Sequence, residues 1–323
     1  MRVLITGGAG FVGSHLADAL LQRGEEVVIY DNFSTGRREN LEHVAGSGKV
    51  TIIEGDIVDE LHVNRVMSSV DACFHLAAAV GVNLIVERPL ESLTTNIRGS
   101  EVVLGAAAHF GVKTLVTSTS EIYGKNISDV MREDDDRILG SPLKVRWTYS
   151  EAKAIEEALA YTLWFAQGLP TVIARLFNTV GPRQTGHYGM VVPRFVNAAL
   201  TGQPLTVYGD GTQSRVFCHV TDAVIGLLAL WDDERAHGDV FNVGGVEEIS
   251  IQELAARVLT LTGSDSPIVR VPYDQAYEPG FEDMQRRVPS TDKLRALTGW
   301  APTHSLDDII RDVVAHQRAT GRS

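Results

Sequence analysis

The chain has 323 residues, 44% of them hydrophobic, and a formal net charge of −12 from 41 acidic and 29 basic side chains. That size supports a large buried core, and an acidic chain without a basic cluster is unsuited to binding nucleic acid. No secretory signal pattern, no apolar run as long as a membrane span and only two cysteines, Cys73 and Cys218, occur in it, so we expect a cytoplasmic protein with no membrane partner, no disulfide framework and no metal site.

Short runs rich in β-branched residues alternate with helical patterns through the first half of the chain. The runs occupy residues 2–6, 26–31, 50–56, 71–77, 112–119 and 171–177. Between them, residues 14–24 and 96–111 carry apolar side chains at helical spacing and end at glycine. This alternation predicts an α/β fold with βαβ units, right-handed crossovers and a parallel sheet.

A glycine motif follows the first predicted strand and opens the first helix. In "TGGAGFVGSHL", Gly7, Gly10 and Gly13 allow a tight turn and a close approach of the backbone to a pyrophosphate. The second strand ends at Asp31, whose carboxylate can accept hydrogen bonds from a ribose. The motif therefore predicts a Rossmann-type, doubly wound sheet that binds NAD. NADP stays a minor alternative because of Arg37 and Arg38.

The helix at residues 149–167 carries a possible catalytic pair. Tyr149 and Lys153 are four residues apart and share one helix face. We expect the ammonium, together with the charge of an oxidised nicotinamide, to lower the pKa of the phenol, which could then take a proton from an alcohol as a hydride leaves. The spacing by itself is also common on surface helices.

The same helix has an apolar face broader than docking on a sheet requires. Its members are Ala152, Ile155, Leu159, Leu163 and Trp164. We expect a homodimer through this helix and the one near residues 96–110. The alternative is a buried layer within one chain.

After residue 177 the pattern changes to glycine- and proline-rich connections, short strands and shorter helices. We expect a smaller C-terminal α/β lobe over the carboxyl ends of the sheet strands, where ligands of open α/β sheets bind. The expected division is an NAD-binding domain at 1–177, to which about 215–245 return, and a substrate lobe at 178–214 and 246–323.

Taken together, these motifs resemble the extended short-chain dehydrogenase/reductase family of nucleotide-sugar enzymes. Further marks of the resemblance are "HLAA", "TSTSEIYG", "YSEAK", "RLFNTVGPRQ", "FNVGG" and "LTGWAP". The resemblance implies that Asn178 and Arg215 hold the diphosphate of a nucleotide-sugar substrate and that Tyr208 lies near its base; Val191 is a further expected substrate contact. The expected cofactor contacts are Gly7, Gly10, Phe11, Val12, Gly13, Asp31, Asn32, Asp56, Ile57, Leu76, Ala77, Ala78, Asn96, Tyr149 and Lys153.

Within this family the residues after the catalytic hydroxyl imply the reaction. All members oxidise C4 of the sugar, and the trio Thr119, Ser120 and Glu121, paired with Arg287, resembles UDP-glucuronate decarboxylases. A C4 ketone is β to the C6 carboxylate, so carbon dioxide can leave as an enolate forms, stabilised by Tyr149 and Thr119. We expect Glu121 and Arg287 to orient the carboxylate and handle the C5 proton, in roles that the sequence leaves unassigned.

Other readings remain open. Glu121 could merely anchor its loop through backbone amides, with Arg287 on a solvated face. Residues 77–89 and 188–195 depart from the decarboxylase pattern, and the segment 132–147 is longer and more charged than that pattern implies. Its acidic run, residues 133–136, is expected to be a solvated loop. The alternatives are a UDP-hexose or UDP-hexuronate 4-epimerase, a nucleotide-sugar 4,6-dehydratase and a non-catalytic dinucleotide-sensing protein.

Overall fold

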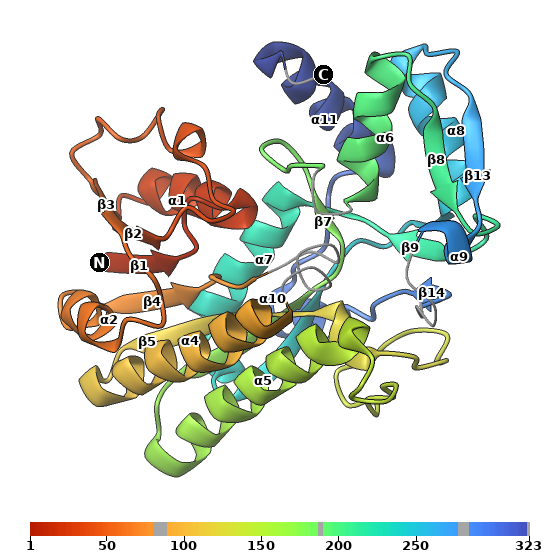
Figure 1. Cartoon of the computed structure of the whole chain (residues 1–323). Coiled ribbons are helices and arrows are strands. Elements are labelled where there is room, and N and C mark those ends of the chain that lie inside the picture. The colour runs from red at the N-terminus through yellow and green to blue at the C-terminus, as the bar shows by residue number, and fades with distance from the viewer. Residues whose placement is uncertain (80–88, 187–189, 277–283, 322–323) are drawn as a thin grey trace.

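The computed structural model describes residues 1–79, 89–186, 190–276 and 284–321. A seven-stranded sheet has the order β11-β6-β5-β4-β1-β2-β3 (Figure 1). The strands are β1 (Arg2–Thr6), β2 (Glu26–Asp31), β3 (Val50–Glu54), β4 (Ala72–His75), β5 (Lys113–Thr119), β6 (Thr171–Leu176) and β11 (Asp239–Val243). Every pairing in this sheet is parallel, which confirms the predicted Rossmann-type topology.

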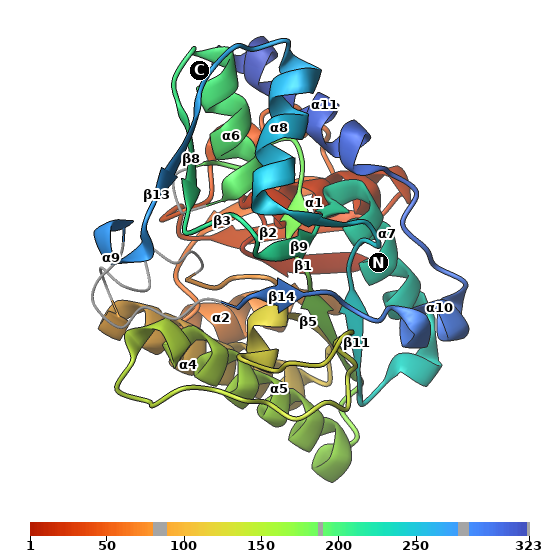
Figure 2. The same cartoon turned by 90° about the vertical axis from the view of Figure 1, so that its right-hand side faces the viewer.

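Helices cover both faces of this sheet (Figures 1 and 2). On one face lie α1 (Phe11–Gln22) and α7 (Val220–Asp232), and on the other α2 (Glu60–Met67), α4 (Pro89–Phe110) and α5 (Thr148–Gln167). Because both faces are covered, β1, β2 and β6 are buried along nearly their whole length. As predicted, α5 ends at Gly168, which takes the left-handed conformation that glycine adopts without strain.

The remaining elements form a smaller group around a hydrophobic cluster of their own. Its helices are α6 (Val191–Leu200), α8 (Ile251–Thr262) and α11 (Leu306–Thr320). Its strands are β8 (Leu205–Tyr208) with β13 (Ile268–Val271), and β9 (Ser214–Val216) between β12 (Glu248–Ser250) and β14 (Arg286–Arg287). The other elements of the described residues are short: η1 (Arg38–Asn40), η2 (Ser120–Tyr123), η3 (Val145–Trp147), β7 (Thr179–Val180), β10 (Cys218–His219), η4 (Glu234–Ala236), α9 (Tyr273–Ala276) and α10 (Asp292–Thr298).

The chain visits the small group and then returns to the large sheet. After β9 and β10 it forms α7 and then β11, which pairs in parallel with β6 at the edge of the main sheet. The core of the large sheet therefore contains residues from before and after β9, including Phe74 and Trp231, whose rings lie 4.6 Å apart.

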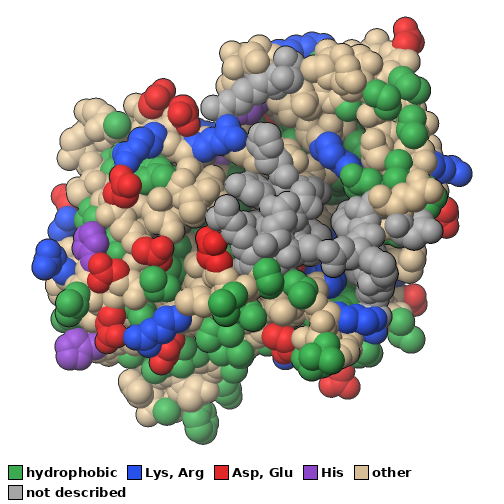
Figure 3. All heavy atoms as spheres, viewed as in Figure 1, with side chains coloured by type: hydrophobic (Ala, Val, Ile, Leu, Met, Phe, Trp, Pro, Cys, Tyr) green, Lys and Arg blue, Asp and Glu red, His purple; other side chains and the backbone are tan. Residues whose placement is uncertain are grey.

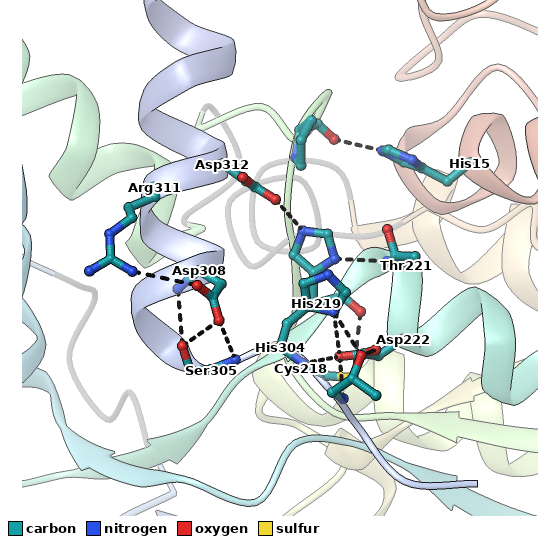
Figure 4. Close-up of polar contacts among 12 residues, drawn as sticks. His15, Cys218, His219, Thr221, Asp222, His304, Ser305, Asp308, Arg311 and Asp312 are labelled. Carbon is teal, nitrogen blue, oxygen red and sulfur yellow. Dashed lines mark hydrogen bonds and ion pairs between the residues drawn. The ribbon is translucent and has the colours of Figure 1, made fainter.

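A polar cluster ties α7 to the beginning and middle of α11 (Figure 4). Asp222 is 1% exposed, and its carboxylate accepts hydrogen bonds from the Thr303 hydroxyl at 2.8 Å and the His304 backbone N–H at 3.0 Å. The ring of His304 stacks on that of His219, with 4.2 Å between their centroids, and His219 Nε2 lies 3.3 Å from Asp312. These contacts fix the orientation of α11 relative to the main sheet.

Apolar side chains gather on the surface formed by α4 and α5, in the lower part of the view in Figure 3. Ile155 and Tyr161 are each 48% exposed and Phe165 is 75% exposed, all on α5, while Phe110 at the end of α4 is 41% exposed. None of the helices in the described ranges is long and apolar enough to cross a membrane.

Candidate functional site

A cavity of about 600 Å³ opens at the carboxyl ends of β1, β2 and β4. This edge of the sheet is where open α/β folds bind their ligands. Most of the expected cofactor contacts line it: Gly7, Gly10, Phe11, Val12, Gly13, Asp31, Asn32, Asp56, Ile57, Leu76, Ala77 and Ala78.

The glycines of the motif are required by close backbone packing. Gly7 has a φ of +70°, and a Cβ there would lie 2.8 Å from the backbone of Ala77. A Cβ on Gly13 would collide with the carbonyl oxygen of Gly7. Gly10 is the N-cap of α1, whose first turn carries no acidic residue. The positive end of the helix dipole therefore meets the cavity uncompensated, as an anion site requires.

Asp31 lies at the cavity in a position fixed by the backbone. Its Oδ2 accepts a hydrogen bond from the Ala9 N–H at 2.9 Å and its Oδ1 from the Phe33 N–H at 2.8 Å. Burial raises the pKa of this carboxyl group against the effect of those two bonds. Each oxygen keeps further acceptor capacity for a ribose hydroxyl. Beside it, the Asn32 side chain donates to Asp56 at 3.0 Å.

Arg183 is a cavity residue that the sequence reasoning did not single out. Its Nη2 donates to Asp18 at 2.7 Å, whereas its buried Nη1 has no hydrogen-bond partner among the described residues. A guanidinium with one spare donor beside a helix N-terminus suits a phosphate. Arg37, which kept the NADP alternative open, lines the same cavity.

Asn96, a further expected cofactor contact, lies against Ala79, a residue of the cavity wall. Its amide is buried, accepts a hydrogen bond from the Ala79 N–H at 2.8 Å and donates to the Ala79 carbonyl at 3.2 Å. An amide can satisfy both backbone groups of one residue at once, so Asn96 holds the segment after β4 in place.

The predicted Tyr–Lys pair lies on α5 beside the end of β5. Tyr149 is 7% exposed and its phenol interacts with the hydroxyl of Thr119, while Lys153 donates to Glu156 Oε2 at 2.7 Å. The expected lowering of the phenol pKa is wrong for the protein alone. Burial raises the pKa of Tyr149, and the carboxylates of Glu156 and Glu121 raise it further, against the Thr119 contact. The ammonium of Lys153 is already occupied by a carboxylate.

Glu121 is clamped between two arginines. Its Oε1 lies 2.5 Å from Arg287 Nη1 and its Oε2 lies 2.6 Å from Arg146 Nη2. Burial opposes ionisation, but the charges of Arg287 and Arg146 outweigh it and lower the pKa of Glu121 to about 2. Arg287 also donates to the Ser120 hydroxyl at 3.2 Å, and its side chain is 12% exposed. This geometry contradicts the reading of Arg287 on a solvated face.

The backbone around Glu121 is fixed from two sides. Thr119 caps η2 by accepting a hydrogen bond from the Glu121 N–H, and the hydroxyl of Ser150 on α5 donates to the Glu121 carbonyl at 2.9 Å. The carboxylate clamp and the Tyr149 phenol are therefore held next to each other by neighbouring residues on two elements.

Arg146, near the end of the charged segment 132–147, was not among the site residues expected from the sequence. It lies on η3, directly before α5, and is 7% exposed. A positive charge three residues before Tyr149 was the available sequence signal, since a helical turn brings residues at that spacing to one side. Glu133 of the same segment is also not simply solvated, because it accepts a hydrogen bond from the Asn242 N–H at 2.8 Å.

The expected substrate contacts lie on two parts of the smaller group. Arg215 on β9 is 7% exposed, and Asn178, with a φ of 33°, donates to the carbonyl of Val216 on the same strand at 2.8 Å. Tyr208 ends β8, where the guanidinium of Arg194 lies 4.6 Å from its ring centroid, and Val191 begins the same helix, α6. Asn178 and Arg215 therefore lie near each other at β9, while Val191 and Tyr208 lie on the adjacent elements α6 and β8.

Two expectations fall partly outside the described residues. Residues 80–88 and 187–189 hold most of the first departure from the decarboxylase pattern and the start of the second. Within the described ranges, no group of three or more histidine, cysteine and acidic side chains is arranged to hold a metal ion.

A doubly wound sheet, a glycine-lined cavity and a buried Tyr-x-x-x-Lys pair beside a strand that ends in threonine define the class of short-chain dehydrogenases/reductases. Residues 4–313 match the family model described as GDP-mannose 4,6 dehydratase, and the chain belongs to this family of enzymes.

Known relatives are similar to this chain over nearly its whole length. UDP-N-acetyl-alpha-D-glucosaminuronate decarboxylase of Bacillus cytotoxicus is 42% identical over 97% of this chain and 96% of its own. UDP-glucuronic acid decarboxylase 1 of Danio rerio is 37% identical over 98% of this chain and 72% of its own. The solved UDP-glucuronic acid 4-epimerase of Bacillus cereus, in complex with UDP-glucuronic acid and NAD, is 28% identical with a TM-score of 0.89 over 99% of this chain and all of its own.

Proposed function

We propose that this protein decarboxylates a UDP-hexuronate, most simply UDP-glucuronate to UDP-xylose, through a transient C4 ketone. The observation that carries the proposal is the buried Arg287–Glu121–Arg146 cluster beside the Tyr149 phenol. Two guanidiniums and one carboxylate give the cluster a net positive charge. This charge can pair with the carboxylate of a hexuronate, whereas a neutral sugar has no group to pair with it.

The cavity supports NAD as the cofactor. Gly7, Gly10 and Gly13 line the cavity beside the N-terminus of α1, and Asp31 offers a carboxylate where the ribose of a dinucleotide would lie. Arg183 offers a spare donor for the diphosphate. When bound, NAD supplies the chemistry of accepting a hydride from the sugar and returning it.

Tyr149 and Thr119 handle the C4 oxygen in this proposal. The ionised phenol takes the hydroxyl proton as C4 is oxidised, and the C5–C6 bond then breaks with its electron pair passing to the C4 oxygen. The Tyr149 and Thr119 hydroxyls donate hydrogen bonds to that developing enolate oxygen. A proton from water adds to C5, and C4 is then reduced as Tyr149 returns its proton to the C4 oxygen.

Arg287 and Arg146 bind the substrate carboxylate, and Glu121 fixes the positions of the two guanidiniums through its two oxygens. With a pKa of about 2, Glu121 is ionised at neutral pH and carries no proton to deliver. This assigns it an orienting role in place of the shared proton-handling role expected from the sequence. When carbon dioxide leaves, the guanidiniums of Arg287 and Arg146 lose the substrate carboxylate but keep their contact with Glu121. This contact limits the free-energy cost of leaving two buried charges without a partner.

A second candidate differs only at C2 of the sugar. The 42% identity to the Bacillus cytotoxicus enzyme makes UDP-N-acetylglucosaminuronate an alternative substrate with the same chemistry at C4, C5 and C6. A UDP-hexuronate 4-epimerase also needs a carboxylate site, and carbon dioxide release separates it from both decarboxylase candidates.

The test is incubation of the purified protein with NAD and each of the two UDP-uronates, followed by mass spectrometry of the nucleotide sugar. We expect loss of carbon dioxide from one of them with no net NADH. An unchanged mass with inverted C4 stereochemistry would contradict decarboxylation in favour of epimerisation. Loss of water from UDP-glucose, which has the C6 hydroxyl that a uronate lacks, would indicate a dehydratase.

We also propose a cytoplasmic homodimer formed through α4 and α5, with the division of domains expected from the sequence. The support is the exposed apolar surface of Ile155, Tyr161, Phe165 and Phe110. Light scattering after size-exclusion chromatography should give twice the chain mass for the protein and a monomer for Phe165→Glu. A monomeric parent protein would contradict the dimer.

A further inference from the structure

Asn242, on the edge strand β11, joins three segments that are far apart in the sequence. Its side chain is fully buried, and its Oδ1 accepts a hydrogen bond from the Tyr123 hydroxyl at 2.7 Å. Its Nδ2 donates to the carbonyls of Met131 at 3.0 Å and Ser290 at 3.2 Å. The last two segments also pair directly, since the Ser290 N–H donates to the Met131 carbonyl and the Met131 N–H to the Val288 carbonyl, both at 2.8 Å.

The orientation of the Asn242 amide follows from the partners of Tyr123. Arg175, which can only donate, places Nη1 2.9 Å from the Tyr123 hydroxyl, so the phenol oxygen accepts this bond. The single hydrogen of the phenol is then directed at Asn242 Oδ1. The amide nitrogen must therefore face the two carbonyls, where both of its hydrogens are used. Arg175 is itself fixed by Glu157, with contacts of 2.8 and 2.9 Å.

Two of the three segments carry the clamp formed by Glu121 and Arg287. Tyr123 ends η2 two residues after Glu121, and Ser290 follows β14 three residues after Arg287. Asn242 therefore acts on the clamp through residues close to each partner in the sequence. A buried polar network whose donors are satisfied holds its members rigidly. The link through Asn242 thus sets the relative position of two charged residues that are 166 positions apart in the chain.

We propose that Asn242 is a positioning residue that fixes the Arg287 strand against the Glu121 turn and so sets the affinity of the site for the sugar carboxylate. The substrate part of this inference rests on the proposed function. A buried ion pair is favourable only when its geometry is good, so a small shift of β14 would weaken both the Glu121–Arg287 contact and carboxylate binding by Arg287. A residue that merely stabilised the fold would affect every ligand of the protein alike.

The first test measures the clamp itself, without any sugar nucleotide. Glu121→Gln and Arg287→Ala are made singly and together, and denaturant unfolding gives the coupling energy between the two side chains. The same cycle is repeated in Asn242→Asp, whose side chain keeps its shape but has at most one hydrogen to donate in place of two. We expect the coupling between Glu121 and Arg287 to fall by about half or more.

This cycle separates positioning from stability. A general loss of stability lowers the unfolding free energy of all four proteins of a cycle equally and leaves the coupling unchanged. Asn40→Asp is the matched control, because Asn40 is also a buried amide, 7% exposed, and donates to the Ala9 carbonyl at 2.9 Å on the cofactor side of the molecule. Its cycle should give the coupling of the parent protein. An unchanged coupling in Asn242→Asp would overturn the role of Asn242.

The second test compares ligands. Asn242→Asp should raise the KM for the UDP-uronate about tenfold or more, because a small misplacement of a binding group is costly. The affinities for NAD and for a neutral UDP-hexose, measured by calorimetry, should stay close to those of the parent protein. Equal losses for all three ligands would show that Asn242 only stabilises the fold and would overturn the proposal.

The two tests also separate this inference from the proposed function. If no UDP-uronate is turned over, the proposed function fails while the coupling between Glu121 and Arg287 still decides the role of Asn242. Should Asn242→Asp not fold, Tyr123→Phe interrupts the same link on the Glu121 side, keeps the two carbonyl contacts of Asn242, and serves in both tests.

Discussion

Arg215 and Arg287 are Cα partners across the parallel strands β9 and β14. Paired residues on neighbouring strands direct their side chains to the same face of a sheet. The arginine expected at the substrate diphosphate and the arginine of the carboxylate clamp therefore leave one small sheet side by side. Like charges in that arrangement repel, and the contact of Arg287 with Glu121 offsets the repulsion.

Replacing Arg287 should separate acidic from neutral substrates. We expect Arg287→Ala to reduce kcat/KM for the UDP-uronate about 100-fold or more, the scale of losing a buried partner for a charged group. Affinity for a neutral UDP-hexose should change less than about tenfold, measured by calorimetry. Arg286→Ala is the control, since Arg286 is adjacent in sequence but partly exposed and paired with Glu248. Equal losses on both substrates would remove Arg287 from the carboxylate site.

Arg146 should contribute to the same binding. Arg146→Gln removes one of two counter-charges from Glu121, so the KM for the UDP-uronate should rise about tenfold or more. Arg137→Gln, which alters an exposed arginine of the same segment, should leave steady-state kinetics unchanged. If Arg146→Gln lowers thermal stability but not uronate binding, the residue serves only to hold Glu121.

Glu121 is expected to act after oxidation at C4. Glu121→Gln keeps the shape of the side chain but weakens its hold on both arginines, so carbon dioxide release should fall about 10-fold to 100-fold. Bound NADH should still form in a single turnover, because Tyr149 and Thr119 are unchanged. Stopped-flow absorbance of NADH together with a carbon dioxide assay measures both steps. Loss of NADH formation as well would indicate a general structural role.

Asp31 should determine the choice of cofactor. Asp31→Ala removes acceptors for the ribose hydroxyls, and we expect NAD affinity to fall about 10-fold to 100-fold, as for a hydrogen bond to a charged group. Arg37, on the same cavity, should then allow NADP to bind better than in the parent protein. Fluorescence titration with both dinucleotides tests this, and an unchanged preference for NAD would show that Asp31 does not select the cofactor.

Stability should fall in mild acid because of buried histidines. Burial lowers the pKa of His15 from 6.5 to about 4, against the hydrogen bond that its ring donates to the Pro182 carbonyl at 3.0 Å (Figure 4). Below about pH 6.5 the unfolded chain therefore binds more protons than the native protein, and the unfolding free energy drops as pH falls toward 4.

The corresponding measurement is the denaturant midpoint as a function of pH. The parent protein should lose about 3 kcal/mol more than His15→Gln between neutral pH and pH 4, since the variant has no titrating ring at this position. His109→Gln is the control because His109 lies near the surface end of α4. Parallel curves for the parent and His15→Gln would contradict a contribution from His15.

Local sequence spacing was sufficient for the cofactor side of the site. The glycine motif between a strand and a helix predicts a dinucleotide site, and an acidic residue at the end of the next strand lies at the same edge of the sheet. Gly7, Gly13 and Asp31 accordingly line one cavity. Tyr149 and Lys153 share a helix face for the same reason. Contacts between residues far apart in the sequence could not be predicted from spacing. Glu121 and Arg287 are 166 positions apart, and only the family resemblance paired them.

The misses have a common physical cause. Arg146 and Glu156 are charged residues at buried positions, and a pattern based on polarity assigns such residues to solvent. The wrong direction for the Tyr149 pKa follows from the same omission, since Lys153 was considered without the carboxylate that occupies it.

The late return of the chain to the main sheet has a consequence for biosynthesis. Because β11 and α7 follow β9, a nascent chain that has emerged only as far as residue 178 still lacks one edge strand and one of the two helices that cover its face of the sheet. The cofactor half therefore finishes folding only after the strand that carries Arg215 has been synthesised. A gene truncated between the two halves would encode a fragment with an open, aggregation-prone edge at β6.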